Sequence, residues 1–349
     1  MNTARNALVE DSEKTWPIRL LSQRSVQLTL ALWVIASLVV LVVAHGNLPF
    51  ARPVVEDLPF VNQLIGPTLA LLQVLGLMGV VYGLTRRRAI PDIAARAPDR
   101  ATAWREVWLL IGYSVLGQIG GFFIARAFGW HPFSFHIAGT LYGAHEHDLA
   151  APAEVFTWAI YNFVVYAVVP YLFFRRRYSA EALNLTSSNR RNDLLVIVVV
   201  LVLEASFQLL ALSSAILRLT PNQLTLGVPL TFGLYFFGTV LPTMILIYAI
   251  LVPRLLKLTG SIATTVILGG IGYTLMHGLD AWLVFTSPTD AVLSVIFLFF
   301  TYFAPGMFKT FLTLRTGNAW VHVWAYHALA PHTLIDTPLM VKVFGIKLY

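Results

Sequence analysis

Long apolar stretches alternate with short polar connections along most of this chain. Nine stretches are each about as long as a helix must be to cross ~30 Å of hydrocarbon. They cover residues 26–45, 60–84, 104–128, 153–174, 194–217, 228–252, 261–286, 288–308 and 317–335. Backbone groups inside a bilayer must be paired within their own segment, so we expect an all-α, polytopic bundle of nine transmembrane helices.

The basic residues lie mostly in the connections on one side of these stretches. If the N-terminus is placed in the cytoplasm, the inner connections hold 19 of the 24 lysines and arginines and the outer ones hold 5. An excess of this kind marks the cytoplasmic side. We therefore predict an N-in, C-out orientation, and the short loops favour a multi-pass protein of a prokaryotic inner membrane.

The same pattern divides the chain into three parts. A cytoplasmic N-terminal segment covers residues 1–25. The first transmembrane helices follow in residues 26–192, with basic cytoplasmic loops and a histidine-rich outer loop. The remaining transmembrane helices lie in residues 193–349.

Composition excludes several classes of protein. Hydrophobic residues make up 57% of the 349 positions and charged residues 12%. In soluble domains roughly 45–50% of the residues are hydrophobic and about 25% are charged, so the chain is not a soluble enzyme. The absence of cysteine excludes thiolate catalysis and cysteine-based zinc sites. The net charge of +7 comes from the basic loops, so we expect membrane lipids, and no nucleic acid, as partners.

One carboxylate lies deep inside a predicted span. Glu204 is about ten residues from the cytoplasmic end of its span, or ~15 Å deep at ~1.5 Å per residue. Gln208 follows one turn later on the same face. A charged group in the bilayer is costly, so Glu204 is a candidate functional residue. The alternative is a protonated glutamate that hydrogen-bonds Gln208 or a neighbouring helix and stabilises packing.

Histidines form the second group of candidates. His277 has Asp280 one turn away, and this pair would orient the imidazole through a hydrogen bond to the carboxylate. Three glycines stand before it, Gly269, Gly270 and Gly272, and they predict a close approach of a neighbouring helix. The alternative for each histidine is a neutral, hydrogen-bonded interior residue.

Three further histidines, His322, His327 and His332, lie on the last span. On an α-helix, two side chains that are five residues apart point in directions that differ by roughly 140°. We therefore expect no shared face and no three-histidine metal site from this helix alone. His327 lies mid-span, ~15 Å from the cytoplasmic end.

The outer loop 129–152 carries four histidines, among them His136. His145, His147 and Asp148 offer imidazole and carboxylate ligands for zinc or another divalent metal. No helical His-x-x-x-His spacing is present, and a solvated polar loop explains the same residues. The cofactor therefore stays unknown, with a divalent metal as the candidate.

Three motifs in the C-terminal part resemble the CPBP family of CAAX proteases and bacteriocin-processing enzymes. They are Val252-Pro253-Arg254-Leu255 with Gly260, Tyr273-Thr274-Leu275-Met276-His277, and Thr316-Gly317-Asn318-Ala319-Trp320 followed by His327. Their order and spacing resemble the family over about residues 235–335. The resemblance implies a CPBP-like core within 193–349 and a catalytic site on His277 and His327, where the family uses a glutamate to activate water.

The residues that would supply the family's chemistry are replaced here. Counting back from Pro253, the family's Glu-Glu pair falls on Thr243 and Met244. The motif arginine falls on Tyr248 and the final asparagine on Pro331. Threonine and methionine cannot act as a carboxylate general base at neutral pH. The resemblance is therefore to a degenerate member of the family.

Three functions are compatible with these residues. The first is a CPBP-fold pseudoprotease that binds a lipid, a lipidated or hydrophobic peptide, or a partner membrane protein. The second is an active intramembrane endopeptidase in which Glu204 replaces the lost base, assisted by His277 and His327. The third is a transporter or an accessory subunit of a membrane complex, which Pro242 and Pro305 favour because they would break two spans.

Overall fold

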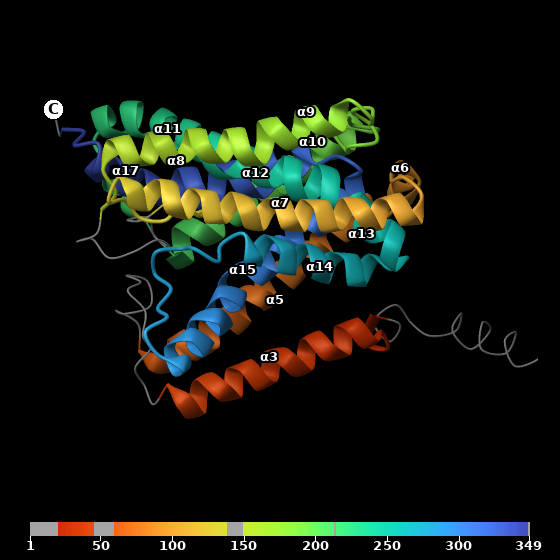
Figure 1. Cartoon of the computed structure of the whole chain (residues 1–349), viewed down its shortest axis with the longest axis horizontal. Coiled ribbons are helices and arrows are strands. Elements are labelled where there is room, and N and C mark those ends of the chain that lie inside the picture. The colour runs from red at the N-terminus through yellow and green to blue at the C-terminus, as the bar shows by residue number, and fades with distance from the viewer. Residues whose placement is uncertain (1–19, 45–58, 138–148, 213, 348–349) are drawn as a thin grey trace, which may run out of the picture.

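The structure, a computed structural model, describes residues 20–44, 59–137, 149–212 and 214–347. Within these residues all regular structure is helical, which confirms the all-α prediction. Most of the long helices run side by side, and α3 (Arg24–Val43) lies along one edge of the molecule, against α5, α14 and α15 (Figure 1).

The helices follow one another with few long connections. In the first half they are α5 Phe60–Thr85, α6 Ile93–Arg96, α7 Arg100–Ala127, α8 Pro152–Asn162, η2 Phe163–Val168, α9 Val169–Arg175, α10 Arg190–Phe207, η3 Gln208–Leu212 and η4 Ala215–Arg218. In the second half they are α11 Pro221–Tyr235, η5 Phe236–Val240, α12 Leu241–Thr243, η6 Met244–Leu251, α13 Val252–Thr259, α14 Ile262–Leu275, α15 Pro288–Thr316, α16 Trp320–His322, η7 Val323–Leu334 and α17 Ile335–Val343. The η4 segment is a 3₁₀ helix and the other η segments are π-helical.

Seven helices in the described part of the chain are long and apolar enough to cross a membrane. They are Arg24–Val43, Phe60–Thr85, Arg100–Ala127, Pro152–Arg175, Arg190–Ala211, Pro221–Thr259 and Pro288–Thr316. Each overlaps one of the nine predicted spans, and together they indicate a multi-pass membrane protein.

The other two predicted spans take a different form. In place of 261–286, α14 has only 14 residues, because the chain then makes tight turns in which Gly278 N bonds Leu275 O and Asp280 N bonds His277 O. In place of 317–335, the continuous α16–η7–α17 helix buries polar side chains against its neighbours. The structure therefore does not reproduce the count of nine, and the N-in, C-out orientation stays a prediction.

Neither Pro242 nor Pro305 breaks its helix, contrary to the prediction. Pro305 lies inside the continuous α15. Pro242 lies in the short α12, between the π-helical η5 and η6. A π-helical register accommodates a residue that cannot donate the usual i→i−4 bond. The helix therefore continues for 39 residues through Pro242.

Two glycines bring α14 and α15 into close contact. A Cβ on Gly269 would lie 2.0 Å from Thr310 Oγ1, and one on Gly270 would lie 2.7 Å from Met307 Cγ. Any larger side chain would push the two helices apart. The predicted close approach is confirmed at these two positions, whereas a Cβ on Gly272 would make only an ordinary contact at 3.7 Å.

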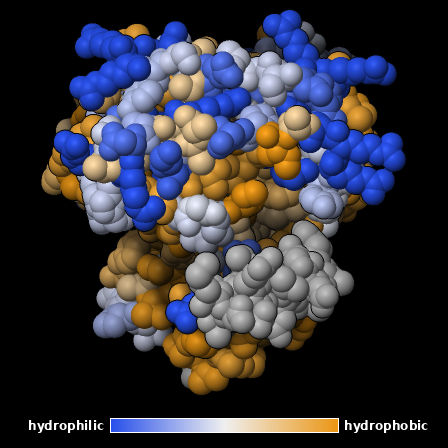
Figure 2. Space-filling view, turned by 90° about the vertical axis from the view of Figure 1, so that its right-hand side faces the viewer, coloured by the Kyte–Doolittle hydropathy of each residue, from blue (hydrophilic) through white to orange (hydrophobic). Residues whose placement is uncertain are grey.

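Basic residues from separate loops meet at one end of the bundle. Arg88 donates to Asp193 at the start of α10, at 2.6 Å. Arg96 of α6 donates to the Asn184 side chain and the Gly317 carbonyl, both at 2.7 Å. Figure 2 looks onto this end, where hydrophilic side chains gather over the upper part. A basic end of this kind is typical of the cytoplasmic side of a membrane protein.

Candidate functional site

Five histidines lie next to one another in the interior of the bundle. Each is at most 4% exposed. In the order His322, His327, His332, His136 and His277, successive ring centroids are 5.9, 5.1, 5.1 and 4.7 Å apart. We call this set the histidine row. The two histidines singled out by the motif resemblance therefore belong to one buried polar cluster.

The three histidines of the last helix share a face because the helix is π-helical there. In η7, the i→i+5 register places residues five apart above one another. His327 and His332 lie within η7, and His322 stands immediately before it. The prediction that these side chains could not share a face is wrong, because it assumed α-helical geometry throughout.

The loop after α7 turns into the bundle and supplies His136. The Ser134 carbonyl accepts hydrogen bonds from Trp158 Nε1 at 2.7 Å and from Asn162 Nδ2 at 2.8 Å, both from α8. A buried loop must satisfy its backbone groups in this way. The loop is therefore anchored in the interior, and it carries His136 with it.

The prediction of a solvated outer loop holds for one of the described histidines and fails for the other. His131 is partly exposed, with its side chain 32% accessible, as expected for such a loop. His136 is buried, so the prediction is wrong for this residue. The metal candidates His145, His147 and Asp148 lie outside the described residues.

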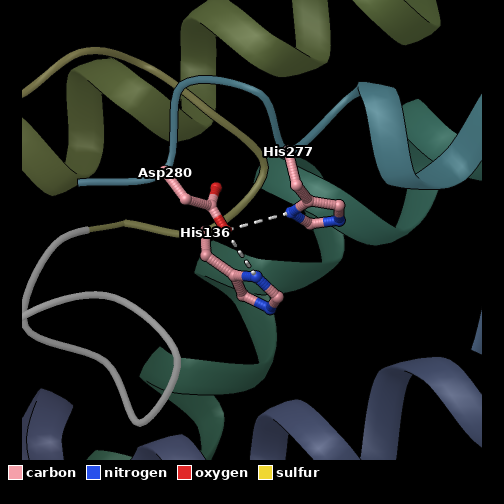
Figure 3. A group of neighbouring side chains, drawn as sticks. All are labelled: His136, His277 and Asp280. Atoms are coloured by element: carbon pink, nitrogen blue, oxygen red, sulfur yellow. Dashed lines mark ion pairs between the residues drawn. The ribbon is translucent and has the colours of Figure 1, made fainter. Parts of the chain in front are cut away.

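Asp280 faces two histidines at the end of the row (Figure 3). Its Oδ2 lies 3.5 Å from His277 Nδ1 and 3.6 Å from His136 Nδ1. Ser134 Oγ donates to Asp280 Oδ1 at 2.5 Å, and the Tyr302 hydroxyl donates to Oδ2. Asp280 thus lies next to His277 as predicted, but the expected hydrogen bond is not formed at this distance, and the fold adds a second imidazole from a distant loop.

The His277 imidazole is enclosed but makes no hydrogen bond. It stacks on Tyr302 of α15, with ring centroids 3.8 Å apart, which is the close approach that the glycines of α14 predicted. Among the described residues, neither of its nitrogens has a hydrogen-bond partner, since the 3.5 Å contact with Asp280 does not qualify as one. Buried polar atoms without a partner are uncommon and costly.

The middle of the row contacts Thr243, one of the two positions at which the motif resemblance implies a glutamate. Here Thr243 Oγ1 lies 3.4 Å from His327 Nδ1. On the other side of the ring, Tyr273 Oη lies 3.3 Å from His327 Nε2. Tyr273 also contacts His277 edge-on, with ring centroids 4.8 Å apart. A threonine hydroxyl and a phenol therefore flank this imidazole, where the resemblance would place a carboxylate.

The other replaced motif positions supply no carboxylate either. Met244 belongs to the hydrophobic core. The Tyr248 ring lies 4.2 Å from the ring of His322, centroid to centroid. Pro331 lies inside η7 and has no polar side chain. These residues pack around the row and offer no general base.

Glu204 accepts hydrogen bonds from two side-chain amides. Gln208 Nε2 donates to it at 2.6 Å and Gln73 Nε2 at 2.8 Å. The predicted contact with Gln208 is therefore present. In the described part of the chain, Glu204 forms no hydrogen bond or ion pair with His277 or His327. The hydrogen bonds that the structure shows for the proposed base therefore go to amides and not to either histidine of the endopeptidase hypothesis.

Lys309 adds a buried cation beside the row. The 19 basic residues that the charge pattern assigns to inner connections include Lys309, but it lies inside α15 and is 1% exposed. Its Nζ lies 3.6 Å from the centroid of the Tyr273 ring, which is a cation–π contact. The face of Tyr273 thus stabilises the charge, while its hydroxyl faces His327.

A groove opens beside the histidine row on the apolar flank of the bundle. It lies between α7, η6 and α14 and has a volume of about 450 Å³. Most of its lining is aliphatic or aromatic, with Ser114 and Gln118 as the polar exceptions. Met276 forms part of its wall, directly before His277 in the chain. The groove is therefore next to the buried polar cluster.

The sequence matches no protein-family model, no curated protein and no solved structure. The CPBP resemblance accordingly consists of the three short motifs. The histidine row and the apolar groove are therefore the features on which a function can be proposed.

Proposed function

We propose that this chain is a multi-pass membrane protein that holds a long hydrocarbon chain in the groove between α7 and α14 and does not hydrolyse peptides. The observation that carries the proposal is the contact of Thr243, in place of a carboxylate, with His327 in a protein that also has an apolar groove. The protein would act in a prokaryotic inner membrane, where the hydrocarbon chain belongs to a lipid or to a lipidated peptide.

The chemistry around His327 supports a loss of peptidase activity. A peptidase of this kind needs a group that removes a proton from water, and a threonine hydroxyl does not do so at neutral pH. The replacement base considered from the sequence, Glu204, accepts hydrogen bonds from Gln73 and Gln208. Among the described residues, His327 therefore faces a threonine hydroxyl and a phenol, and no carboxylate takes the place of the expected base.

The groove supports the binding of a hydrocarbon chain. A volume of about 450 Å³ falls within the roughly 300–1,000 Å³ of typical ligand pockets. Bilayer lipid is as apolar as the groove, so selectivity must come from close packing and from polar groups. The polar groups of the lining are Ser114, whose hydroxyl donates to the Leu110 carbonyl, and Gln118, whose Nε2 donates to the Leu275 carbonyl and keeps a second N–H for the ester or amide that joins a chain to its headgroup or peptide.

Photocrosslinking tests the binding. The full chain in lipid nanodiscs receives a phospholipid with a diazirine on its acyl chain. We expect labelling of α7 and α14, and a several-fold loss of labelling in Gly272→Phe, which fills the groove. Gly79→Phe on α5 is the matched control, because Gly79 has open space around it and lies outside the groove. Equal labelling in both variants would rule out the groove as the binding site.

Competition and mass spectrometry complete the test. An excess of unlabelled phospholipid or of a prenylated peptide is added, and the stronger competitor identifies the source of the chain. The same peptide is then analysed for cleavage. Cleavage that His327→Ala abolishes would contradict the proposed loss of peptidase activity, and labelling that neither competitor reduces would contradict specific binding.

A further inference from the structure

His136, His277 and Asp280 form a three-residue cluster with the composition of a metal site. Their ligand atoms all lie within 4.8 Å of one another, and all three side chains are buried. Two of the residues come from the turn after α14, and the third comes from the anchored loop after α7. This cluster is separate from the His327 position on which the proposed function depends.

Two of the three distances between the ligand atoms are close to those around a tetrahedral ion. Metal–ligand bonds of about 2.0–2.1 Å place neighbouring ligand atoms of a tetrahedron about 3.3–3.4 Å apart. The Asp280 carboxylate oxygen lies 3.5 Å from His277 Nδ1 and 3.6 Å from His136 Nδ1. These distances are too long for good hydrogen bonds, whereas a small shift would make them the edges of a coordination sphere.

The missing hydrogen bonds of His277 are an independent indication of a ligand. The ring is fully buried, and neither nitrogen has a hydrogen-bond partner among the described residues. Nδ1 is aimed at the carboxylate (Figure 3). A neutral imidazole with an available lone pair in a water-poor interior is a typical ligand for a divalent transition metal.

The groups around the cluster would orient its ligands. Ser134 Oγ and the Tyr302 hydroxyl donate to the two oxygens of Asp280, and Trp282 Nε1 lies 3.3 Å from Oδ2. Metal-ligating carboxylates are commonly positioned by such hydrogen bonds. Tyr302 Oη also lies 2.9 Å from His136 Nδ1 and, since its own proton goes to Asp280, it accepts from Nδ1–H; a bound metal ion would take the place of this proton.

The charge of an ion would be partly balanced inside the bundle. Asp280 contributes one negative charge directly. A second buried carboxylate, Asp336, lies 3.2 Å from His332 Nδ1, and the His332 ring is 5.1 Å from that of His136. Buried charges require partners of this kind.

We propose that His136, His277 and Asp280 bind one divalent transition-metal ion, of the class of Zn²⁺. Imidazole nitrogen and carboxylate oxygen are ligands that zinc prefers, and three protein ligands leave a fourth position for another group. One of the three ligands, His277, directly follows Met276, which forms part of the wall of the hydrocarbon groove.

Metal analysis of the full chain tests the proposal. The protein is purified in detergent with a tag that contains no histidine, stripped with a chelator, and equilibrated with Zn²⁺ or Co²⁺. We expect one equivalent of metal per chain, and for Co²⁺ the visible absorption of a four-coordinate ion. A folded wild-type protein that retains no metal after desalting would overturn the proposal.

Two variants locate the ion. The Asp280→Asn variant should no longer bind the metal ion, whereas the His322→Gln variant should still bind one equivalent. His322 is a matched control, because it is a fully buried member of the same row whose ring nitrogens likewise have no hydrogen-bond partner among the described residues. Loss of metal in His322→Gln with retention in Asp280→Asn would place the ion elsewhere in the row and overturn the assignment.

A cysteine variant tests the assignment independently, in case the first two variants do not fold. His277→Cys keeps a ligand at this position, so it should still bind Co²⁺ and gain the near-ultraviolet charge-transfer band of a cobalt–thiolate bond. A purely structural histidine would give no such band, and its absence in a folded His277→Cys protein that binds Co²⁺ would exclude His277 as a ligand. Tyr302→Phe should weaken affinity by roughly 10–100-fold, as for other groups that orient a ligand.

Discussion

Arg254 and Glu106 form a buried ion pair near the basic end of the bundle. Arg254 is 0% exposed, and its Nε donates to Glu106 Oε2 at 2.8 Å. Its guanidinium also lies 4.7 Å from the centroid of the Tyr178 ring. Burial, and then the hydrogen bond to Glu106, raise the pKa of Tyr178, so the phenol remains a donor to the carboxylate. The motif that contains Arg254 therefore has a structural role in this chain.

Removing one partner of this pair should destabilise the protein more than removing both. Glu106→Leu leaves the Arg254 charge buried without its carboxylate, and we expect it to lower the free energy of unfolding by about 3–5 kcal/mol. The double variant Glu106→Leu/Arg254→Met should recover most of this loss, because both charges are then absent. Equilibrium unfolding in mixed micelles measures the difference. A double variant as unstable as the single one would show that the pair is not the cause.

Single residues could be assessed from the sequence only by type and local spacing. His277 with Asp280, and Glu204 with Gln208, were both identified because their partners lie within one helical turn. The third member of the Asp280 cluster, His136, lies 141 positions before His277 in the sequence. Its apolar neighbours in Phe133-Ser134-Phe135-His136 were a sign of burial, but they do not indicate what the loop would contact.

At the scale of elements, π-helical geometry decides which side chains meet. Hydropathy identifies a helix, but it does not distinguish an i→i+4 from an i→i+5 register. The prolines at 242 and 331 lie in or beside the π-helical stretches, and proline removes one backbone donor from the helix. The contact of His322, His327 and His332 along one face depends on this π-helical register. A prediction that assumes α-helical geometry places them on different faces.

The contact between α14 and α15 gives a prediction at the same scale. Gly269→Val should destabilise the protein by at least the roughly 1–3 kcal/mol of an overpacked core, because Thr310 occupies the space that a side chain would need. Gly272→Ala is the control, since its Cβ would meet only ordinary van der Waals contact. Unfolding midpoints in detergent compare the two. An equal effect of both changes would contradict the close contact of α14 with α15.

The whole molecule has one basic end, which the charge pattern assigns to the cytoplasm. The chain contains no cysteine, so single cysteines can report on the two ends without background. Glu181→Cys lies in the loop after α9, and Thr289→Cys lies at the start of α15, at the opposite end of the bundle (Figure 1).

In intact cells, a membrane-impermeant maleimide should label Thr289→Cys and not Glu181→Cys. The physical reason is that the basic loops stay on the cytoplasmic side. Permeabilised cells, in which both positions should react, provide the control. Labelling of Glu181→Cys alone would reverse the predicted orientation, and labelling of both would show that the two positions lie on one side.

The sequence by itself determined that this chain is an all-helical, multi-pass membrane protein. Helices in a bilayer satisfy their backbone locally, so hydropathy along the chain is enough to find most of them. The sequence also identified His277 and His327 through local motifs.

Only the tertiary structure decided which of these residues come together. The histidine row depends on a π-helical register, on two glycines that bring α14 against α15, and on a loop that is drawn inside by Trp158 and Asn162. These are packing and hydrogen-bonding events between segments far apart in the sequence, and local periodicity carries no information about them. The same packing left Thr243 beside His327 and kept Glu204 with its two glutamines, which is why the functional proposal is one of binding.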